Sequence, residues 1–306
     1  MSLKVRVRRL EPRFLRSNGT PNFSSRVYEK HGDVKVIARR PVITAAPTMP
    51  IIDALKVMAS RGFRRLPVTS TSSRLLGIVT AMDFMDYFGG GSKFNIIVNR
   101  HRYRLYAAFN EPLESIMTRD VVKAYLDETF IDVLAKMVKY NVGAIPVVTW
   151  DDRIYGIITE KDVVDHLADK ITGKRIRDVM SCDVVTVESS STFKDALKTM
   201  VSNGFRRLPV IEGEEVRGML VAMDVVRFLA GEVFEHVRSE DVRDVLKVKV
   251  EEIMVKDVVT VDPDSDIGDA ASLMRKHGRG SLLVVENSKL VGIITERDLL
   301  MAVVLE

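Results

Sequence analysis

The stretch IYGIITEKDVVDHL, residues 154–167, indicates a repeated fold, because the chain contains three more stretches of the same pattern. They are LLGIVTAMDFMDYF (75–88), VRGMLVAMDVVRFL (216–229) and LVGIITERDLLMAV (290–303). In each of them an aspartate follows a glycine by six positions. Self-similarity of this kind is the sequence signature of a chain built from repeated structural units. We number these copies one to four in chain order.

The similarity extends upstream of this tail in all four copies. Each has an earlier aspartate, 29 or 30 residues before that of the tail, which opens an amphipathic stretch and is followed five positions later by a methionine. The aspartates are Asp53, Asp132, Asp195 and Asp269, and the methionines are Met58, Met137, Met200 and Met274. Short β-branched runs precede them at 41–44, 121–124, 184–187 and 258–261.

The periodicity within each copy predicts a β-α-β-β-α unit. A Val-rich strand precedes an amphipathic helix whose apolar residues recur at helical spacing. The runs RLPV, AIPVV, RLPV and LLVV then predict a second strand, which a polar turn joins to a third strand that begins at the glycine of the tail. A final helix follows. A unit this small buries too little apolar surface alone, so we expect the copies to pair.

The composition is that of a soluble globular protein, since 46% of the 306 residues are hydrophobic and 29% are charged. Its apolar runs are shorter than the ~18 residues that span a bilayer, and its start lacks the apolar core of a signal peptide. The lone Cys182 excludes an internal disulfide, fits a cytoplasmic protein and is expected to fill space in the core. The histidines show no metal-ligand spacing, so we predict no metal site.

The net charge of +4 is unevenly distributed. Residues 1–40 carry eleven Lys and Arg against three acids, which is +8 and leaves −4 for the rest of the chain. We therefore expect residues 1–35 to form a basic N-terminal extension outside the repeats. Clustered basic residues make nucleic-acid contact one alternative for this arm, beside solvation or docking to a partner.

The repeated unit, with G-I-[IV]-T-x-x-D at its end and [RG]-x-[LI]-P-V in its middle, resembles the cystathionine-β-synthase (CBS) domain. Two CBS domains make a Bateman module, and four in one chain are similar to the γ subunit of AMP-activated protein kinase and its prokaryotic stand-alone relatives. The resemblance covers residues 36–306, and the segment 88–117 is also similar to the linker of those relatives. It implies an α/β fold of the α+β kind, with paired CBS units in a flat disc.

The resemblance also implies domain boundaries. They are CBS 1 at 36–90, a linker plus CBS 2 at 91–170, CBS 3 at 171–231, and a linker plus CBS 4 at 232–306. The first two would form one Bateman module (36–170) and the last two the other (171–306). The expected assembly is a monomeric disc of four CBS domains or a homodimer.

The T-x-x-D motif of the tail is the first candidate site. Its structural alternative is a capping box, in which Ser or Thr precedes an acid by three residues at a helix start. However, capping boxes favour Glu or Gln, whereas all four copies have Asp, and copy three keeps its Asp although Val221 replaces the threonine. An aspartate at a helix start stays ionised and accepts two ribose hydroxyls, while the N–H groups and the Thr hydroxyl favour phosphate.

The resemblance implies the same roles for these positions. It places ribose on Asp83, Asp162, Asp224 and Asp298, and phosphate on Thr80, Thr159 and Thr295. Since copy three lacks the hydroxyl, we expect its pocket to be weaker or empty.

Adjacent arginines precede the second-strand proline in the odd copies only. They are Arg64 and Arg65 in copy one and Arg206 and Arg207 in copy three, against Gly143-Ala144 and Gly280-Ser281 in copies two and four. Protection of a strand edge is the structural alternative. Guanidinium groups bind phosphate by bidentate, charge-assisted bonds, so we interpret the pairs as phosphate ligands and the small residues as room for the ligand. In the γ family, basic residues at these positions contact ligand phosphates.

The resemblance further implies an apolar slot for adenine, although the side chains that would line it are also ordinary core residues. They are Thr44, Thr186, Thr260, Phe63, Val142 and Phe205.

The sequence contains no nucleophile elbow, P-loop or kinase signature, so we predict no catalysis. We interpret the chain as a regulatory protein without cofactor that binds AMP, ADP or ATP in clefts between paired repeats and senses energy state. A protein target such as a kinase is implied by the resemblance only. Two alternatives remain, namely binding of S-adenosylmethionine or a related thio-adenosine, and a nucleic-acid-binding scaffold that uses the basic arm.

Overall fold

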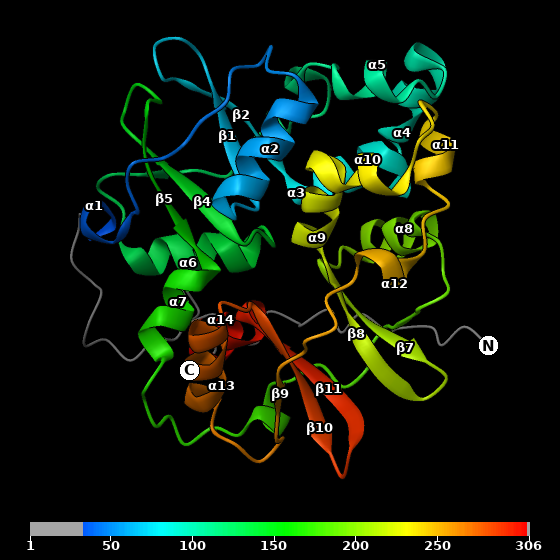
Figure 1. Cartoon of the computed structure of the whole chain (residues 1–306). Coiled ribbons are helices and arrows are strands. Elements are labelled where there is room, and N and C mark those ends of the chain that lie inside the picture. Colours follow the sequence, from blue (N-terminus) through cyan, green and yellow to red (C-terminus); the bar gives the residue numbers. More distant parts are fainter. Residues whose placement is uncertain (1–32, 305–306) are drawn as a thin grey trace. The chain divides into compact units, whose positions relative to one another are not determined.

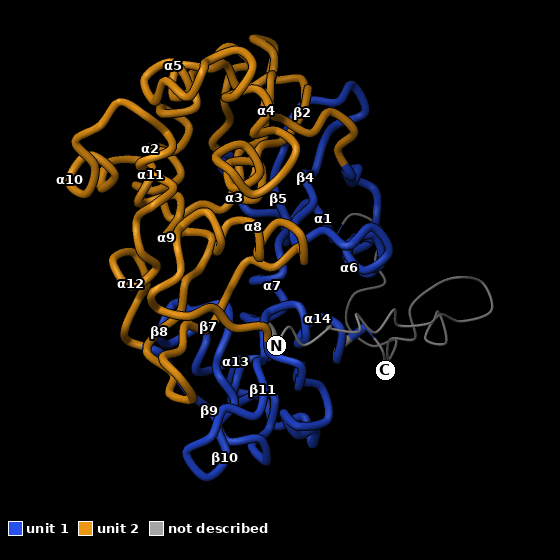
Figure 2. Tube along the Cα trace, turned by 90° about the vertical axis from the view of Figure 1, so that its right-hand side faces the viewer, with its two compact units in different colours: residues 1–42, 122–184, 258–306 blue, residues 43–121, 185–257 orange. Residues whose placement is uncertain are grey.

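The structure is a computed structural model that describes residues 33–304, so the predicted basic extension lies outside the described residues except for 33–35 (Figure 1). The described chain divides into two compact units (Figure 2). Unit 1 comprises residues 33–42, 122–184 and 258–304, and unit 2 comprises 43–121 and 185–257. Unit 1 therefore holds copies two and four, and unit 2 holds copies one and three. The pairing of copies one with two and three with four stays a prediction.

Each copy contains the predicted two helices and the predicted second and third strands (Figure 1). In unit 2, copy one has α2 (Ile51–Arg61), β1 (Arg65–Thr69), β2 (Leu75–Thr80) and α3 (Ala81–Met85), and copy three has β6 (Val187–Glu188), α8 (Phe193–Asn203), β7 (Arg207–Glu212), β8 (Glu215–Val221) and α9 (Ala222–Arg227). In unit 1, copy two has β3 (Ala124–Tyr125), α6 (Phe130–Lys139), β4 (Ala144–Val148), β5 (Ile154–Thr159) and α7 (Glu160–Leu167), and copy four has β9 (Thr260–Val261), α13 (Ile267–His277), β10 (Ser281–Glu286), β11 (Lys289–Thr295) and α14 (Glu296–Val304). The predicted α+β fold class is confirmed.

Short helices occupy the segments around the copies. They are α1 (Val34–Ile37), α4 (Phe94–Ile96), α5 (Leu105–Phe109), α10 (Val233–His236), α11 (Val242–Val245) and α12 (Val250–Ile253). π-Helical turns lie at Asp86–Gly90, Ile97–His101 and Phe228–Glu232, and 3-10 turns at Leu113–Ser115 and Ile176–Asp178.

The first strands are shorter than predicted. In copy one the run 41–44 forms no strand, and a single parallel bridge joins Ala45 to Val68. In the other copies only two residues pair with the second strand, namely Ala124–Tyr125, Val187–Glu188 and Thr260–Val261. The reason is that only the end of each β-branched run lies beside the central strand. The second and third strands form the predicted antiparallel hairpins in all four copies.

The upstream motif is explained by helix capping and packing. Thr129 and Thr192 accept hydrogen bonds from the N–H of Asp132 and Asp195 at the starts of α6 and α8 (both 3.2 Å). The repeated methionines are buried in the core of the unit that holds them, with exposures between 0% and 1%. They are Met58 and Met200 in unit 2, and Met137 and Met274 in unit 1.

The repeated glycines lie where another chain segment crosses the third strand. A Cβ atom on Gly218 would lie 2.6 Å from the carbonyl oxygen of Val255, and one on Gly77 would lie 2.9 Å from that of Thr118. Gly156 and Gly292 are crowded in the same way by Ala38 and Met180. Each crossing segment precedes the first strand of a different copy. Copies one and two exchange these segments reciprocally, and so do copies three and four.

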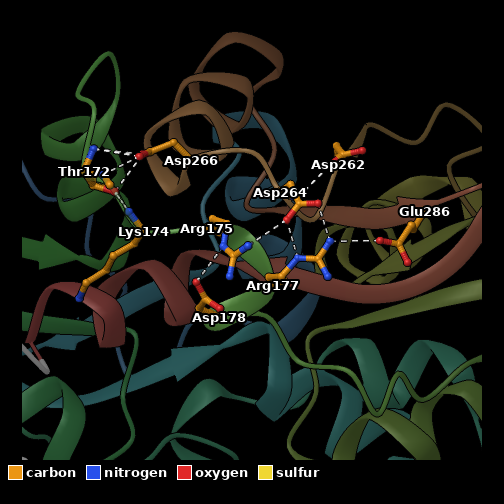
Figure 3. Close-up of polar contacts among 10 residues, drawn as sticks. Thr172, Lys174, Arg175, Arg177, Asp178, Asp262, Asp264, Asp266 and Glu286 are labelled. Atoms are coloured by element: carbon orange, nitrogen blue, oxygen red, sulfur yellow. Dashed lines mark hydrogen bonds and ion pairs between the residues drawn. The ribbon is translucent and has the colours of Figure 1, made fainter.

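Polar side chains tie the segment after copy two to the start of α13 in unit 1 (Figure 3). Asp266 accepts hydrogen bonds from the hydroxyl of Thr172 (2.9 Å) and from the N–H of Gly268 at the helix start (2.7 Å). Burial raises the pKa of Asp266, but these donors and neighbouring N–H groups outweigh it and hold the pKa below its usual value. Arg177 binds Asp264 beside this cluster (2.6 Å). These contacts fix the linker where it meets copy four.

Two further observations concern the chain as a whole. Cys182 is exposed, so the prediction that it fills the core was wrong. It lies next to Ser181, whose backbone pairs with Ile293 of β11, in the segment that crosses this strand. Among residues 33–304, no helix is both long and apolar enough to cross a membrane.

Candidate ligand-binding site

The T-x-x-D motif lies at the junction between the third strand and the final helix of each copy. In copy one, Asp83 Oδ2 accepts hydrogen bonds from the N–H and from the hydroxyl of Thr80, both at 2.7 Å. Asp83 is only 8% exposed. One oxygen of its carboxylate therefore caps the start of α3, where the backbone N–H groups need acceptors.

The same bond occurs in the other three copies. Asp162 accepts from the N–H of Thr159 at 2.7 Å, and Asp298 accepts from the N–H of Thr295 at 2.8 Å. In copy three the N–H of Val221 donates to Asp224 Oδ2 at 2.9 Å, although the hydroxyl is missing. All four aspartates therefore cap a helix through Oδ2. Any further role of the motif depends on the other carboxylate oxygen, Oδ1. Their binding of ribose stays a prediction.

The second oxygen of Asp83, Asp162 and Asp224 binds a basic side chain. Asp83 Oδ1 accepts from the ammonium group of Lys93, and Asp224 Oδ1 accepts from Arg227 one turn further along α9 (3.0 Å). Asp162 Oδ1 accepts from Nε of Arg39 at 2.5 Å. Lys93 belongs to the linker after copy one, Arg227 to the same helix as Asp224, and Arg39 to the segment before copy one.

Arg39 is held by two carboxylates one turn apart on α7. Its Nη2 group donates to Asp165 Oδ2 at 2.6 Å, next to the bond with Asp162. Burial lowers the pKa of Arg39, but the bonds to Asp162 and Asp165 outweigh burial and raise it above its usual value. Copy one has a related arrangement, in which Asp83 binds the ammonium group of Lys93 and Asp86 Oδ1 accepts from the backbone N–H of the same residue (2.9 Å).

Sequence reasoning missed these cations and the second acid. A signal existed, since copies one and two both read D-x-x-D, with Asp83/Asp86 and Asp162/Asp165. An acid three residues after the motif lies on the same helix face and can bind the same cation. The identity of the cation could not be read from the sequence, since Arg39 lies 123 residues from Asp162.

The arginine pairs lie directly beside the T-x-x-D motif of their own copy. Arg65 pairs across the hairpin with Thr80, and Arg207 pairs with Val221. The carbonyl of Arg64 accepts from the N–H of Ala81 at 3.0 Å, so its backbone is fixed at the first residue of α3. Arg206 makes the equivalent bond to Ala222 (2.9 Å). All four arginines are half-buried.

The small residues of the even copies occupy the same places. Ala144 pairs with Thr159 and Ser281 with Thr295. The carbonyls of Gly143 and Gly280 accept from the first N–H of α7 and α14, at 3.1 and 3.0 Å. The backbone of all four sites is therefore alike, and the copies differ in whether the two positions carry guanidinium groups.

The predicted adenine residues are divided between the two units. Thr44, Thr186, Phe63 and Phe205 belong to unit 2, and Val142 and Thr260 belong to unit 1. The hydroxyl of Thr44 accepts from that of Thr69 (3.2 Å). Phe63 is 39% exposed, whereas Phe205 and Val142 pack against the cores of their units. The adenine slot stays a prediction.

Unit 1 contains a buried ion pair next to these sites. Glu160, the first residue of α7, is 2% exposed, and it binds Nη1 of Arg297 on α14 at 3.3 Å. Arg297 also donates to Asn141 Oδ1 at 2.8 Å. The equivalent first residues in unit 2 are Ala81 and Ala222. Among the described residues, no group of His, Cys, Asp or Glu side chains is arranged to hold a metal ion.

Comparison with known proteins adds the family. A family model described as CBS domain matches residues 32–90, 113–169, 176–231 and 250–305. Uncharacterised protein MJ1225 from Methanocaldococcus jannaschii is 37% identical over 275 residues, which cover 87% of this chain and 97% of that protein. An uncharacterised 33.4 kDa protein from the ribosomal RNA operon of Thermofilum pendens is 30% identical over 86% of this chain and 89% of its own length.

Solved structures give the same result. The crystal structure of MJ1225, described as a proposed archaeal homologue of g-AMPK, has a TM-score of 0.83 and 35% identity, and the match covers 88% of this chain and 99% of that one. An uncharacterised conserved protein from Pyrococcus horikoshii matches with a TM-score of 0.57 and 21% identity over 89% of this chain and 99% of that one. The second match concerns the fold alone.

Proposed function

The chain belongs to the CBS domain family, and from this premise we propose that it is a non-catalytic regulatory protein that binds AMP, ADP or ATP and thereby senses energy state. The expected resemblance to four CBS domains is confirmed. The observation that carries the proposal is the placement of two kinds of residue. A buried aspartate suited to ribose lies next to paired arginines suited to phosphate in copies one and three.

The chemistry of the two groups suits the two halves of a nucleotide. An ionised carboxylate is an acceptor only, so it binds the paired hydroxyl donors of a ribose. A guanidinium group carries only donors and matches the geometry of phosphate oxygens. The similarity to MJ1225, whose structure is described as a proposed homologue of g-AMPK, supports adenine nucleotides as the ligand class.

We propose further that the chain regulates a protein target. A regulatory protein acts on a partner only if its ligand binds two states of the protein with different affinity. S-adenosylmethionine or a thio-adenosine is the alternative ligand class, because it would use the same aspartates. Such ligands need no paired arginines, so the arginines favour nucleotides.

The test of the ribose role is isothermal titration of Asp162→Ala with adenosine, AMP and ATP. Because a hydrogen bond to a charged group contributes about 1.5–3 kcal/mol, we expect affinity at this site to fall roughly 10- to 100-fold for all three ligands. Asp132→Ala is the matched control, since Asp132 caps α6 of the same copy through the same bonds to Thr129 (3.0 and 2.7 Å). It should leave binding unchanged.

The test of the phosphate role compares Arg65→Ala and Arg207→Ala with Arg61→Ala, an exposed arginine at the end of α2. We expect the first two to weaken ATP and ADP much more than adenosine. Equal losses for adenosine and ATP would contradict the phosphate role of the arginines. An affinity for a thio-adenosine far above that for any nucleotide would replace the proposed ligand class.

A further inference from the structure

The cations bound to Asp83 and Asp162 stand where a ribose would have to bind. In both aspartates Oδ2 accepts the N–H and the hydroxyl of the preceding threonine, so Oδ1 is the oxygen with room for a further donor. That oxygen accepts from Lys93 in copy one and from Arg39 in copy two. A ribose that donates both of its hydroxyls to either aspartate needs both acceptor positions of Oδ1, and it therefore competes with a cation of the protein itself.

Both carboxylates are too buried to lose their cation without cost. The side chains of Asp83 and Asp162 are 11% and 8% exposed. A buried charge that loses its partner is strongly destabilised, and neutral hydroxyls replace only part of an ammonium or guanidinium. The displaced Lys93 ammonium, too, needs a new anion nearby, whereas Arg39 keeps Asp165 as a partner. A nucleoside brings hydroxyls only, whereas a nucleotide brings hydroxyls and a phosphate.

We infer that Lys93 and Arg39 are exchangeable counterions, which bind the ribose carboxylates as in this structure and transfer to the phosphate when a nucleotide binds. This inference rests on the proposed function and adds residues to its site. In copy one it makes the phosphate necessary for a reason separate from the arginine pairs, because without it the displaced Lys93 has no anion to bind, whereas Arg39 in copy two keeps its bond to Asp165. Lys93 suits the task, since its ammonium is a point charge on a flexible stem.

The exchange in copy one also reaches the linker to copy two. The ammonium of Lys93 donates to the backbone carbonyl of Ile116 as well (2.6 Å), and the backbone N–H of Lys93 donates to Asp86. Lys93 thus joins the start and the end of the segment 93–116 to the site. When the ammonium group of Lys93 moves to a ligand phosphate, its hydrogen bond to the carbonyl of Ile116 breaks. Phosphate binding therefore changes the contacts that hold the linker in unit 2.

Copy three differs in a way that fits the inference. Its cation, Arg227, lies on α9 itself, one turn after Asp224, in the position of Asp86 in copy one. Because Arg227 and Asp224 lie on the same helix, displacement of this cation cannot alter the contacts of a distant segment. Copies one and two instead keep an acid at this position and take the cation from elsewhere in the chain.

Calorimetric titration of the full chain with adenosine and with AMP tests the exchange in Lys93→Met and, independently at another site, in Arg39→Met. We expect adenosine to bind more tightly than to wild type, because its competitor is gone. AMP should bind no more tightly, because its counterion is gone too. The ratio of AMP to adenosine affinity at the altered site should fall by about tenfold, the loss of one charge-assisted bond.

Two controls accompany the titrations. Lys93→Arg keeps a cation and should keep the wild-type ratio, and Lys198→Met, at an exposed position on α8, should change neither affinity. An unchanged ratio in both Lys93→Met and Arg39→Met, with AMP still bound at the wild-type level, would overturn the exchange and leave the proposed function standing. A wild-type protein that binds none of adenosine, AMP, ADP and ATP would overturn both the exchange and the proposed function.

Discussion

At the scale of single residues, the proposed site consists of groups that already serve the fold, since its aspartates cap the starts of helices. The aspartates were predictable from their repetition, and so was their place at a helix start. Their cations were not, because Lys93 and Arg39 come from segments with no regular pattern, and a contact between distant residues leaves no local trace. Glu160 lies in the first turn of α7, and its sequence position does not show that it is buried and binds Arg297.

The pair of Glu160 and Arg297 makes a prediction about stability. Glu160→Ala leaves the guanidinium of Arg297, itself only 20% exposed, without its carboxylate. We expect the free energy of unfolding to fall by about 1–3 kcal/mol, measured by chemical denaturation. Glu160→Ala combined with Arg297→Met gives unit 1 the same residue types that unit 2 has at the equivalent positions, Ala81 and Met223.

The double variant should therefore lose less stability than the sum of the two single changes. Lys161→Met, at an exposed position in the same turn, is the control and should change stability by less than about 0.5 kcal/mol. Strict additivity of the two single changes would show that Glu160 and Arg297 do not interact.

At the scale of elements, the β-α-β-β-α order was predictable because each element has its own period and its own stop signal. The first strands were predicted too long, since a β-branched run indicates extended chain but not how much of it has a neighbour. The repeated glycines were visible in the sequence without their reason. Only the structure shows that another segment crosses the third strand at each glycine.

Gly218→Ala tests this account of the glycines. The new methyl group would lie 2.6 Å from the carbonyl oxygen of Val255, which is fixed by two hydrogen bonds of 2.9 Å between Val255 and Met219. We expect a loss of about 1–3 kcal/mol, seen as a lower melting temperature. Gly231→Ala, where nothing lies within 4 Å of the new atom, should not lower it. Equal melting temperatures for the two variants would contradict the crossing.

At the scale of the whole molecule, the four repeats were readable from the spacing of their motifs, and the family matches in four places. The grouping into units was not readable, because it depends on which helix faces pack together. Within the described residues, copies one and three share one core and copies two and four share the other. The basic arm remains a sequence-based hypothesis, since residues 1–32 lie outside the described part.

The central claim is that the chain binds adenine nucleotides. Native mass spectrometry of the purified full chain, followed by release and identification of the bound molecule, tests it most directly. The account predicts AMP, ADP or ATP at one to four molecules per chain, either carried through purification or taken up when added. A thio-adenosine in their place, or a protein that stays empty when all three nucleotides are added, would contradict it.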